Sequence, residues 1–142
     1  MSADKRLADA RDLSQLLIQV AELTKSRFAK ISEDLGVPVQ VARGICLLQT
    51  AVPMNELASM LDCDKSYITP LADHMESLGL VTRVPGEDRR TKLLALTSEG
   101  KTMRQKLAEK VTEASPMMIA LDEIQRASFE QMLRQILSES GR

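Results

Sequence analysis

The sequence predicts a mainly α-helical protein with a small β wing, in which N- and C-terminal dimerisation helices flank a winged helix-turn-helix. Two helical patterns, Asn55–Leu61 and a longer one that ends at Gly79, are joined by a short turn. Two short β-type runs, Leu80–Val84 and Lys92–Leu96, then lie on either side of the basic connection PGEDRRT. Two helices followed by a charged hairpin indicate docking on duplex DNA, with the second helix in the major groove.

The length and composition predict one domain, residues 1–142, because 142 residues with 44% hydrophobic content can bury a core of their own. The N-terminus, MSADKRLADARDL, lacks the apolar segment of a signal peptide, and no apolar run reaches the length of a membrane span. We therefore expect a cytoplasmic protein that does not bind membranes. The single histidine and two cysteines far apart in sequence argue against a metal site or other cofactor.

The first dimerisation helix is expected at about residues 7–35, where apolar residues recur at intervals of three and four. Gly36 and Pro38 end this pattern. The winged helix-turn-helix core follows at about residues 38–97, and it opens with a largely buried helix over Val39–Thr50.

The second dimerisation region is expected at about residues 98–139. Pro116 breaks or bends its helical pattern, and Asp122 with Gln125 resembles a capping box that opens a last helix. The two ends of the chain together carry more apolar face than a compact winged helix can cover. This surplus predicts a homodimer, the alternative being that these helices only close the core of a monomer.

The second helix of the motif should turn Ile68, Leu71, Met75 and Leu78 toward the core. Hydroxyl groups and free backbone N–H groups near the start of the helix suit contacts with phosphates and base edges. The residues of this helix that we assign to double-stranded DNA are Lys65, Ser66, Tyr67, Thr69, Pro70 and His74. Asp73 and Glu76 would repel phosphates unless they contact a cytosine amino group or pair with a neighbouring cation.

Pro70 is in conflict with this helix, since Thr69-Pro70 has the features of a helix start. We place the start near Asp64 instead, because the apolar stripe already begins at Ile68. The longer helix loses the backbone hydrogen bond to the carbonyl group of Ser66 and should bend.

The wing supplies further DNA contacts. From Arg83 to Lys92 there are four basic residues and two acids, although the net charge of the whole chain is −1. We assign DNA contacts to Arg83, Asp88, Arg89 and Arg90. An arginine of a wing can insert into a narrow minor groove. We assign insertion to Arg90, with Arg89 as the competing choice, and the holding of the loop and orientation of the guanidinium to Asp88.

The segments ELASML, KSYITPLADHMESLGLV and EDRRTKLLALTSEG resemble the MarR family of dimeric bacterial transcription regulators. The wing motif Asp-x-Arg, followed by an apolar strand and Leu-Thr-x-x-Gly, is matched by Asp88, Arg90, Leu96, Thr97 and Gly100. The resemblance implies a triangular dimer with intertwined terminal helices that grips palindromic DNA. It also implies repression that is relieved by a small aromatic or phenolic effector or by thiol oxidation.

Two features depart from the family pattern. The wing is about one residue shorter than usual, and His74 stands where the family often has arginine. Two cysteines are candidates for oxidation: Cys63, in the turn between the helices, is the better one, because Cys46 lies in an apolar helix where thiols are commonly inert.

The leading hypothesis is a DNA-binding transcriptional regulator. The alternative is a winged-helix protein–protein interaction module without DNA binding, which the acidic flank of the second helix and the near-zero net charge favour. An enzyme is disfavoured, because the sequence offers no Gly-rich phosphate loop and no nucleophile–base pair.

Overall fold

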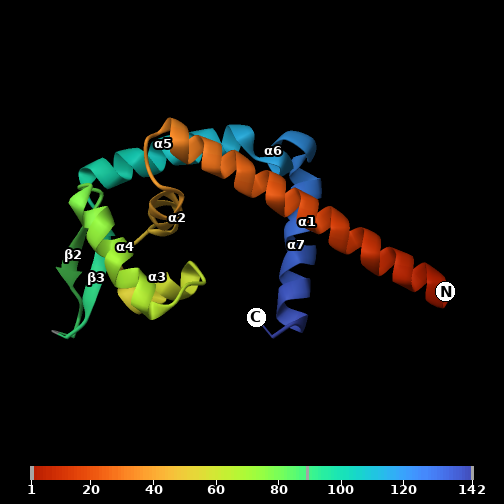
Figure 1. Cartoon of the computed structure of the whole chain (residues 1–142), viewed down its shortest axis with the longest axis horizontal. Helices are drawn as coiled ribbons and strands as arrows, with labels where there is room; N and C mark the ends of the chain where they lie inside the picture. Colours follow the sequence, from red (N-terminus) through yellow and green to blue (C-terminus); the bar gives the residue numbers. More distant parts are fainter. Residues whose placement is uncertain (1, 89, 142) are drawn as a thin grey trace. The chain divides into compact units, whose positions relative to one another are not determined.

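The computed structural model describes residues 2–88 and 90–141, and the chain divides into two compact units. One unit comprises residues 28–110, and the other comprises residues 1–27 and 111–142. Helices make up most of the described chain, and three short strands form a small antiparallel sheet (Figure 1). The predicted fold class, mainly helical with a small wing, is confirmed.

We call residues 28–110 the winged unit. Its helices include α2 (Val39–Leu47), α3 (Met54–Met60) and α4 (Lys65–Ser77). Helix α2 ends earlier than the predicted Thr50, because the backbone N–H of Leu48 bonds back to Gly44 and Ile45 and the chain then leaves the helix. Helix α4 begins at Lys65 and contains Pro70, so the longer helix that the sequence predicted is confirmed.

The wing sheet has the order β1-β3-β2, with β1 (Val52–Pro53), β2 (Val81–Pro85) and β3 (Lys92–Leu96). Its register pairs Val52 with Leu94 and, on the other side of β3, Arg83 with Leu94. Strands β2 and β3 were predicted within one residue. Strand β1 was not predicted, because a strand of only two residues, one of them a proline, shows no alternation of apolar and polar residues.

The core of the winged unit is built from aliphatic side chains of α2, α3, α4 and the sheet. The buried positions include Val41, Ala42, Ile45, Leu57, Ala58, Ile68, Leu71, Ala72, Met75, Val81 and Leu94. Three members of the predicted stripe of α4 are buried, but the prediction for Leu78 was wrong, since it is 45% exposed. The chain leaves α4 at Leu78 and turns at Gly79 with φ 75°, so that Leu80 enters the core instead.

A tight junction joins the end of α4, the wing and the start of α5 (Ser98–Ala114). The hydroxyl of Thr97 donates to the carbonyl oxygen of Gly79 at 2.6 Å and accepts from the backbone N–H of Gly100 at 3.0 Å. A Cβ atom on Gly100 would lie 2.0 Å from the carbonyl oxygen of Leu80. The Leu-Thr-x-x-Gly pattern therefore has a physical basis, because no side chain fits at this junction.

The other unit contains most of α1 (Ala3–Asp34), the end of α5, α6 (Pro116–Ala120) and α7 (Glu123–Glu139). As predicted, Pro116 follows the end of α5, and Asp122 and Gln125 form a capping box at the start of α7. Arg27 donates to the carbonyl oxygen of Ala114 at 2.7 Å.

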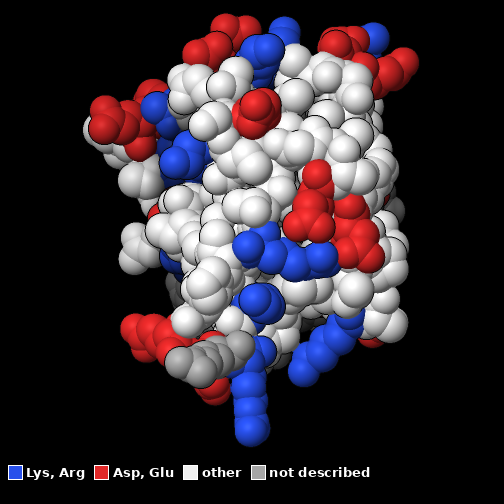
Figure 2. Space-filling view, turned by 90° about the vertical axis from the view of Figure 1, so that its left-hand side faces the viewer, with Lys and Arg blue, Asp and Glu red and all other residues white. Residues whose placement is uncertain are grey.

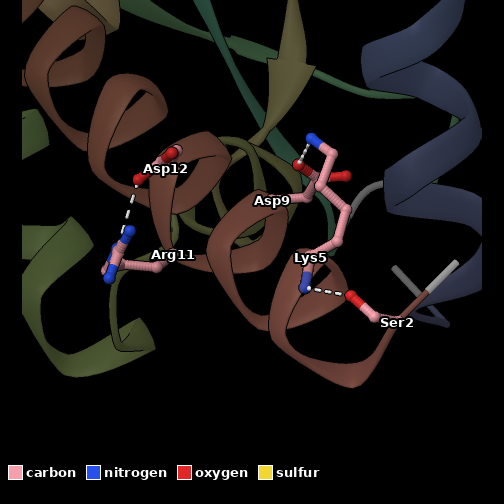
Figure 3. Close-up of polar contacts among 5 residues, drawn as sticks. All are labelled: Ser2, Lys5, Asp9, Arg11 and Asp12. Atoms are coloured by element: carbon pink, nitrogen blue, oxygen red, sulfur yellow. Dashed lines mark hydrogen bonds and ion pairs between the residues drawn. The ribbon is translucent and has the colours of Figure 1, made fainter.

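The first turns of α1 carry local polar contacts on their surface (Figure 3). Lys5 pairs with Asp9 at 2.6 Å and Arg11 with Asp12 at 3.2 Å, while the hydroxyl of Ser2 accepts from the backbone N–H of Lys5 at 3.2 Å. Exposed pairs of this kind contribute little stability. In the described part of the chain, every helix is too short or too polar to cross a bilayer.

We expect Gly100→Ala to lower the free energy of unfolding by roughly 2–4 kcal/mol, because a new Cβ would collide with backbone rather than with a movable side chain. The matched control is Gly44→Ala, whose Cβ meets the flexible end of Met75 at 3.1 Å and should have a much smaller effect. Urea denaturation measures both. A Gly100→Ala variant as stable as the wild type would contradict the junction.

Candidate nucleic-acid interface

The predicted DNA-facing residues of α4 all lie on its exposed surface. Those residues are Lys65, Ser66, Tyr67, Thr69, Pro70 and His74. Asp64 precedes the helix in an extended conformation, and its side chain does not cap the first turn. The backbone N–H groups of the first turn are thus left without a side-chain acceptor from Asp64, and such groups bind phosphate oxygens well.

Arg83 of β2 connects the wing to the recognition helix. Its guanidinium group bonds to Asp73 at 2.5 Å and to Glu76 at 3.1 Å, both on α4. The hydrogen bond to Asp73 is the main cause that raises the pKa of Arg83 above its ordinary value. The side chain of Arg83 is 31% exposed. The two carboxylates therefore pair with a guanidinium group that the protein partly covers.

This bridge changes what Arg83 can do at a DNA surface. We predicted Arg83 as a DNA contact, whereas both hydrogen-bonding ends of its guanidinium face protein carboxylates. The sequence raised pairing with a neighbouring cation as one fate of Asp73 and Glu76, but the cation could not be named. The two hydrogen bonds from its guanidinium group to α4 identify this cation as Arg83.

The tip of the wing is a turn that Asp88 holds together. The carboxylate of Asp88 accepts from the backbone N–H of Arg90 at 3.1 Å, and its carbonyl oxygen accepts from the N–H of Thr91 at 2.9 Å. Gly86 and Thr91 close the turn with a further backbone bond of 2.9 Å. Asp88 therefore acts on the main chain of Arg90, whose side chain is exposed. Arg89 lies outside the described residues.

The face around the hairpin is mixed in charge. Figure 2 shows basic and acidic side chains touching near the middle of this face, with further basic side chains toward its lower edge. The chain has a net charge of −1 and keeps acidic residues near the predicted DNA-facing side of α4. Two of these acids, Asp73 and Glu76, are paired with Arg83.

Cys46 and Cys63 are both free and partly buried. Burial raises the pKa of the Cys46 thiol, and the nearby positive charge of Arg104 offsets only part of this effect. Cys46 is therefore a poor source of thiolate at neutral pH. Within residues 2–88 and 90–141, no group of His, Cys, Asp and Glu side chains could hold a metal ion.

Comparison with known proteins decides the family of this chain. A model of the MarR family matches residues 47–92, which run from the end of α2 to the start of β3. FarR of Neisseria gonorrhoeae, an HTH-type transcriptional regulator, is 29% identical over 126 residues, covering 87% of this chain and 84% of FarR. The chain belongs to the MarR family.

Solved structures agree with this assignment. CouR from Rhodococcus jostii RHA1, bound to p-coumaroyl-CoA, matches with a TM-score of 0.75 and 27% identity over 91% of this chain and 92% of CouR. A mutant MarR from E. coli complexed with operator DNA has the same fold, with a TM-score of 0.73 and 21% identity over 91% of this chain and 96% of that one.

The MarR assignment settles the class of function. The chain is a DNA-binding transcriptional regulator of the winged helix-turn-helix type and not an enzyme. The alternative of a winged-helix interaction module without DNA binding is therefore set aside.

The Arg83 bridge generates a test that separates charge masking from direct phosphate contact. Arg83→Ala should weaken binding to a mixed-sequence duplex by about tenfold, because it leaves Asp73 and Glu76 unpaired beside the phosphates. In an Asp73→Asn, Glu76→Gln background the same change should have little effect. Fluorescence anisotropy over a salt series measures each variant, and circular dichroism checks that each is folded.

A direct phosphate contact by Arg83 predicts a different outcome. Arg83→Ala would then weaken binding equally in both backgrounds and lower the salt slope by about one in each. That result would contradict the masking role.

Proposed function

We propose that this MarR-family protein is a cytoplasmic homodimeric repressor that binds a pseudo-palindromic operator and is released by a small ligand or by thiol oxidation. In this proposal residues 1–142 act as one domain. Residues of about 7–35 and 98–139 hold the dimer together, and residues 38–97 bind double-stranded DNA.

The main support for the dimer is the exposed apolar surface of the terminal helices. In α1, Leu13 is 68% exposed and Leu16 is 58% exposed, and in α7, Ile124 and Ile136 are 81% and 56% exposed. Helix α7 has no buried residue. Contiguous apolar surface of this kind is characteristic of an interface, since each leucine or isoleucine left in water forgoes about 1.5–3 kcal/mol.

A two-fold dimer would present two copies of α4 to the same duplex. Because the two copies are related by a two-fold axis, the sequence that they read must be a pseudo-palindrome with half-sites about one helical turn apart.

We assign the DNA contacts within each protomer as follows. Ser66, Tyr67 and Thr69 contact base edges or phosphates, and Lys65 contacts a phosphate. His74 takes a phosphate or base contact in place of the usual arginine. In the wing, Arg90 enters a groove while Asp88 holds its main chain, and Arg89 is the competing choice for insertion.

The release mechanism rests on two supports. CouR was solved with p-coumaroyl-CoA bound, and the phenolic group of that thioester supports an effector with an aromatic or phenolic group for this chain. If oxidation acts instead, Cys63 is the better sensor, since burial raises the pKa of Cys46. Cys63 lies between α3 and α4, where a bulky oxidised thiol would displace the recognition helix.

The dimer is tested by sedimentation at micromolar concentration. The wild type should sediment as a dimer, and Leu13→Glu should weaken the dimer by roughly a hundredfold, because a charge replaces an apolar contact on both protomers. Ser14→Glu adds the same charge at the neighbouring exposed position and should remain dimeric. A well-folded wild-type monomer would rule out the proposed dimer.

Recognition helix and wing should respond differently to mutation. Arg90→Ala should weaken operator and random DNA alike and lower the salt slope by about one, because an arginine that neutralises a phosphate is lost. Thr69→Ala should cost roughly 1–3 kcal/mol on the operator only, the amount of one good base contact. Lys106→Ala, an exposed change on α5, is the control. The wing is not a DNA contact if Arg90→Ala binds both duplexes like the wild type.

A further inference from the structure

We propose that the recognition helix reads the exocyclic amino group of an adenine or a cytosine with a backbone atom, the carbonyl oxygen of Ser66. The contact rests on the proposed function, because it requires that α4 enters the major groove. It gives a role to Pro70, which lies inside α4 although proline strongly destabilises a helix interior. Pro70 is exposed, so its side chain does not offset this cost by filling the core. Local rules are broken in this way mainly at functional sites.

Pro70 deprives one carbonyl group of α4 of its helical partner. In an α-helix the carbonyl oxygen of residue 66 accepts from the N–H group of residue 70, and proline has no N–H group. Within a helix, a proline ring also crowds the carbonyl group of the fourth residue before it, which tilts that oxygen away from the helix axis. The carbonyl oxygen of Ser66 therefore needs a donor from outside the regular helix, either water or a ligand.

This oxygen lies on the side of α4 that is farthest from the core. Successive residues of an α-helix are about 100° apart around its axis. The buried residues Ile68, Ala72 and Met75 therefore share one side of the helix, and Ser66 and Pro70 lie opposite them. Because a helix carbonyl points along the axis toward the residue four positions later, the oxygen of Ser66 lies between these two exposed residues. A base edge in the groove can reach it there.

The same side of the helix carries further acceptors. Four exposed residues form this side, which we call the outer ridge of α4: Ser66, Pro70, Asp73 and Ser77. The carboxylate of Asp73 is held by Arg83 at 2.5 Å, and its side chain is still 60% exposed. The hydroxyl of Ser77 donates to the carbonyl oxygen of His74 at 2.6 Å, so its oxygen remains as an acceptor. The outer ridge therefore favours bases that present donors.

The edges of the bases decide which of them suits an acceptor. In the major groove, adenine and cytosine each present an amino group that donates, whereas guanine presents two acceptors and thymine presents an acceptor and a methyl group. Opposite guanine or thymine, the carbonyl oxygen of Ser66 would lose its water without gaining a donor, which is unfavourable. We therefore expect adenine or cytosine opposite Ser66, on the strand that the outer ridge faces.

The experiment first selects duplexes from a random library with the wild type and with Pro70→Ala. The wild type should enrich adenine or cytosine at one position of each half-site, and Pro70→Ala should lose the preference at that position alone. The variant supplies the missing N–H group, which occupies the carbonyl oxygen of Ser66. It should fold at least as well as the wild type, because it removes a proline from a helix. Ser66→Ala is the matched control, since it changes the side chain and leaves the carbonyl group.

Base analogues then test the amino group itself. In the enriched duplex, the base at that position is replaced by its analogue without the exocyclic amino group, which is purine for adenine and pyrimidinone for cytosine. The replacement should weaken binding of the wild type and of Ser66→Ala by about tenfold and leave binding of Pro70→Ala nearly unchanged, as measured by fluorescence anisotropy. The lost base pairing affects the duplex equally for all three proteins, so only a direct contact separates them.

Equal loss of affinity in all three proteins, or no loss in any of them, would overturn the contact by Ser66. The second of these results is also what a contact of the Pro70 ring with the base predicts. Wild-type binding to the analogue duplex decides the matter even if a variant does not fold, because no loss there already excludes an amino contact. A wild type that enriches no sequence would overturn the repressor and the Ser66 contact together. An enriched inverted repeat that does not depend on an amino group would overturn the Ser66 contact alone.

Discussion

The close approach of Gly100 to the carbonyl group of Leu80 is the constraint on which the winged unit depends. The chain turns there at Gly79 after α4, β2 begins, β3 ends and α5 starts, and the hydroxyl of Thr97 bonds to Gly79 and Gly100. Because the recognition helix and the wing leave the same junction, their relative placement is fixed there by the close approach of Gly100 to Leu80 and by the hydroxyl of Thr97. A surface that must match two features of one duplex requires this rigidity.

Electrostatics then decides whether that surface can approach DNA. The chain has no excess of positive charge, and two carboxylates of α4 lie close to the proposed docking face. Arg83 covers both from the adjacent strand, and the exposed cations of the described residues there include Lys65 of α4 and Arg90 and Lys92 of the wing. Affinity in such a protein comes from a few placed charges and from hydroxyl and backbone donors, so it should depend on salt less steeply than that of a basic domain.

The sequence predicted those features of the fold that depend on interactions between neighbouring residues. The capping box of Asp122 and Gln125, the left-handed Gly79 and the two hairpin strands all follow from neighbouring residues, and all are present. Strand β1 could not be predicted, because it depends on the register between segments distant in sequence. The partners of Arg83 could not be named either, because they depend on how the turn after α4 returns β2 to the helix. The exposure of Leu78 was missed for a related reason, since periodicity does not show where a helix stops and the chain turns back.

The central claim is that two protomers, each reading DNA with α4 and the wing, act on one operator. Selection of genomic DNA fragments by the purified full chain, followed by sequencing of what is retained, tests it most directly. A two-fold dimer should enrich an inverted repeat whose half-sites are centred about one helical turn, roughly 10 base pairs, apart. Enrichment of a single unrepeated half-site, or no enrichment at all, would contradict it.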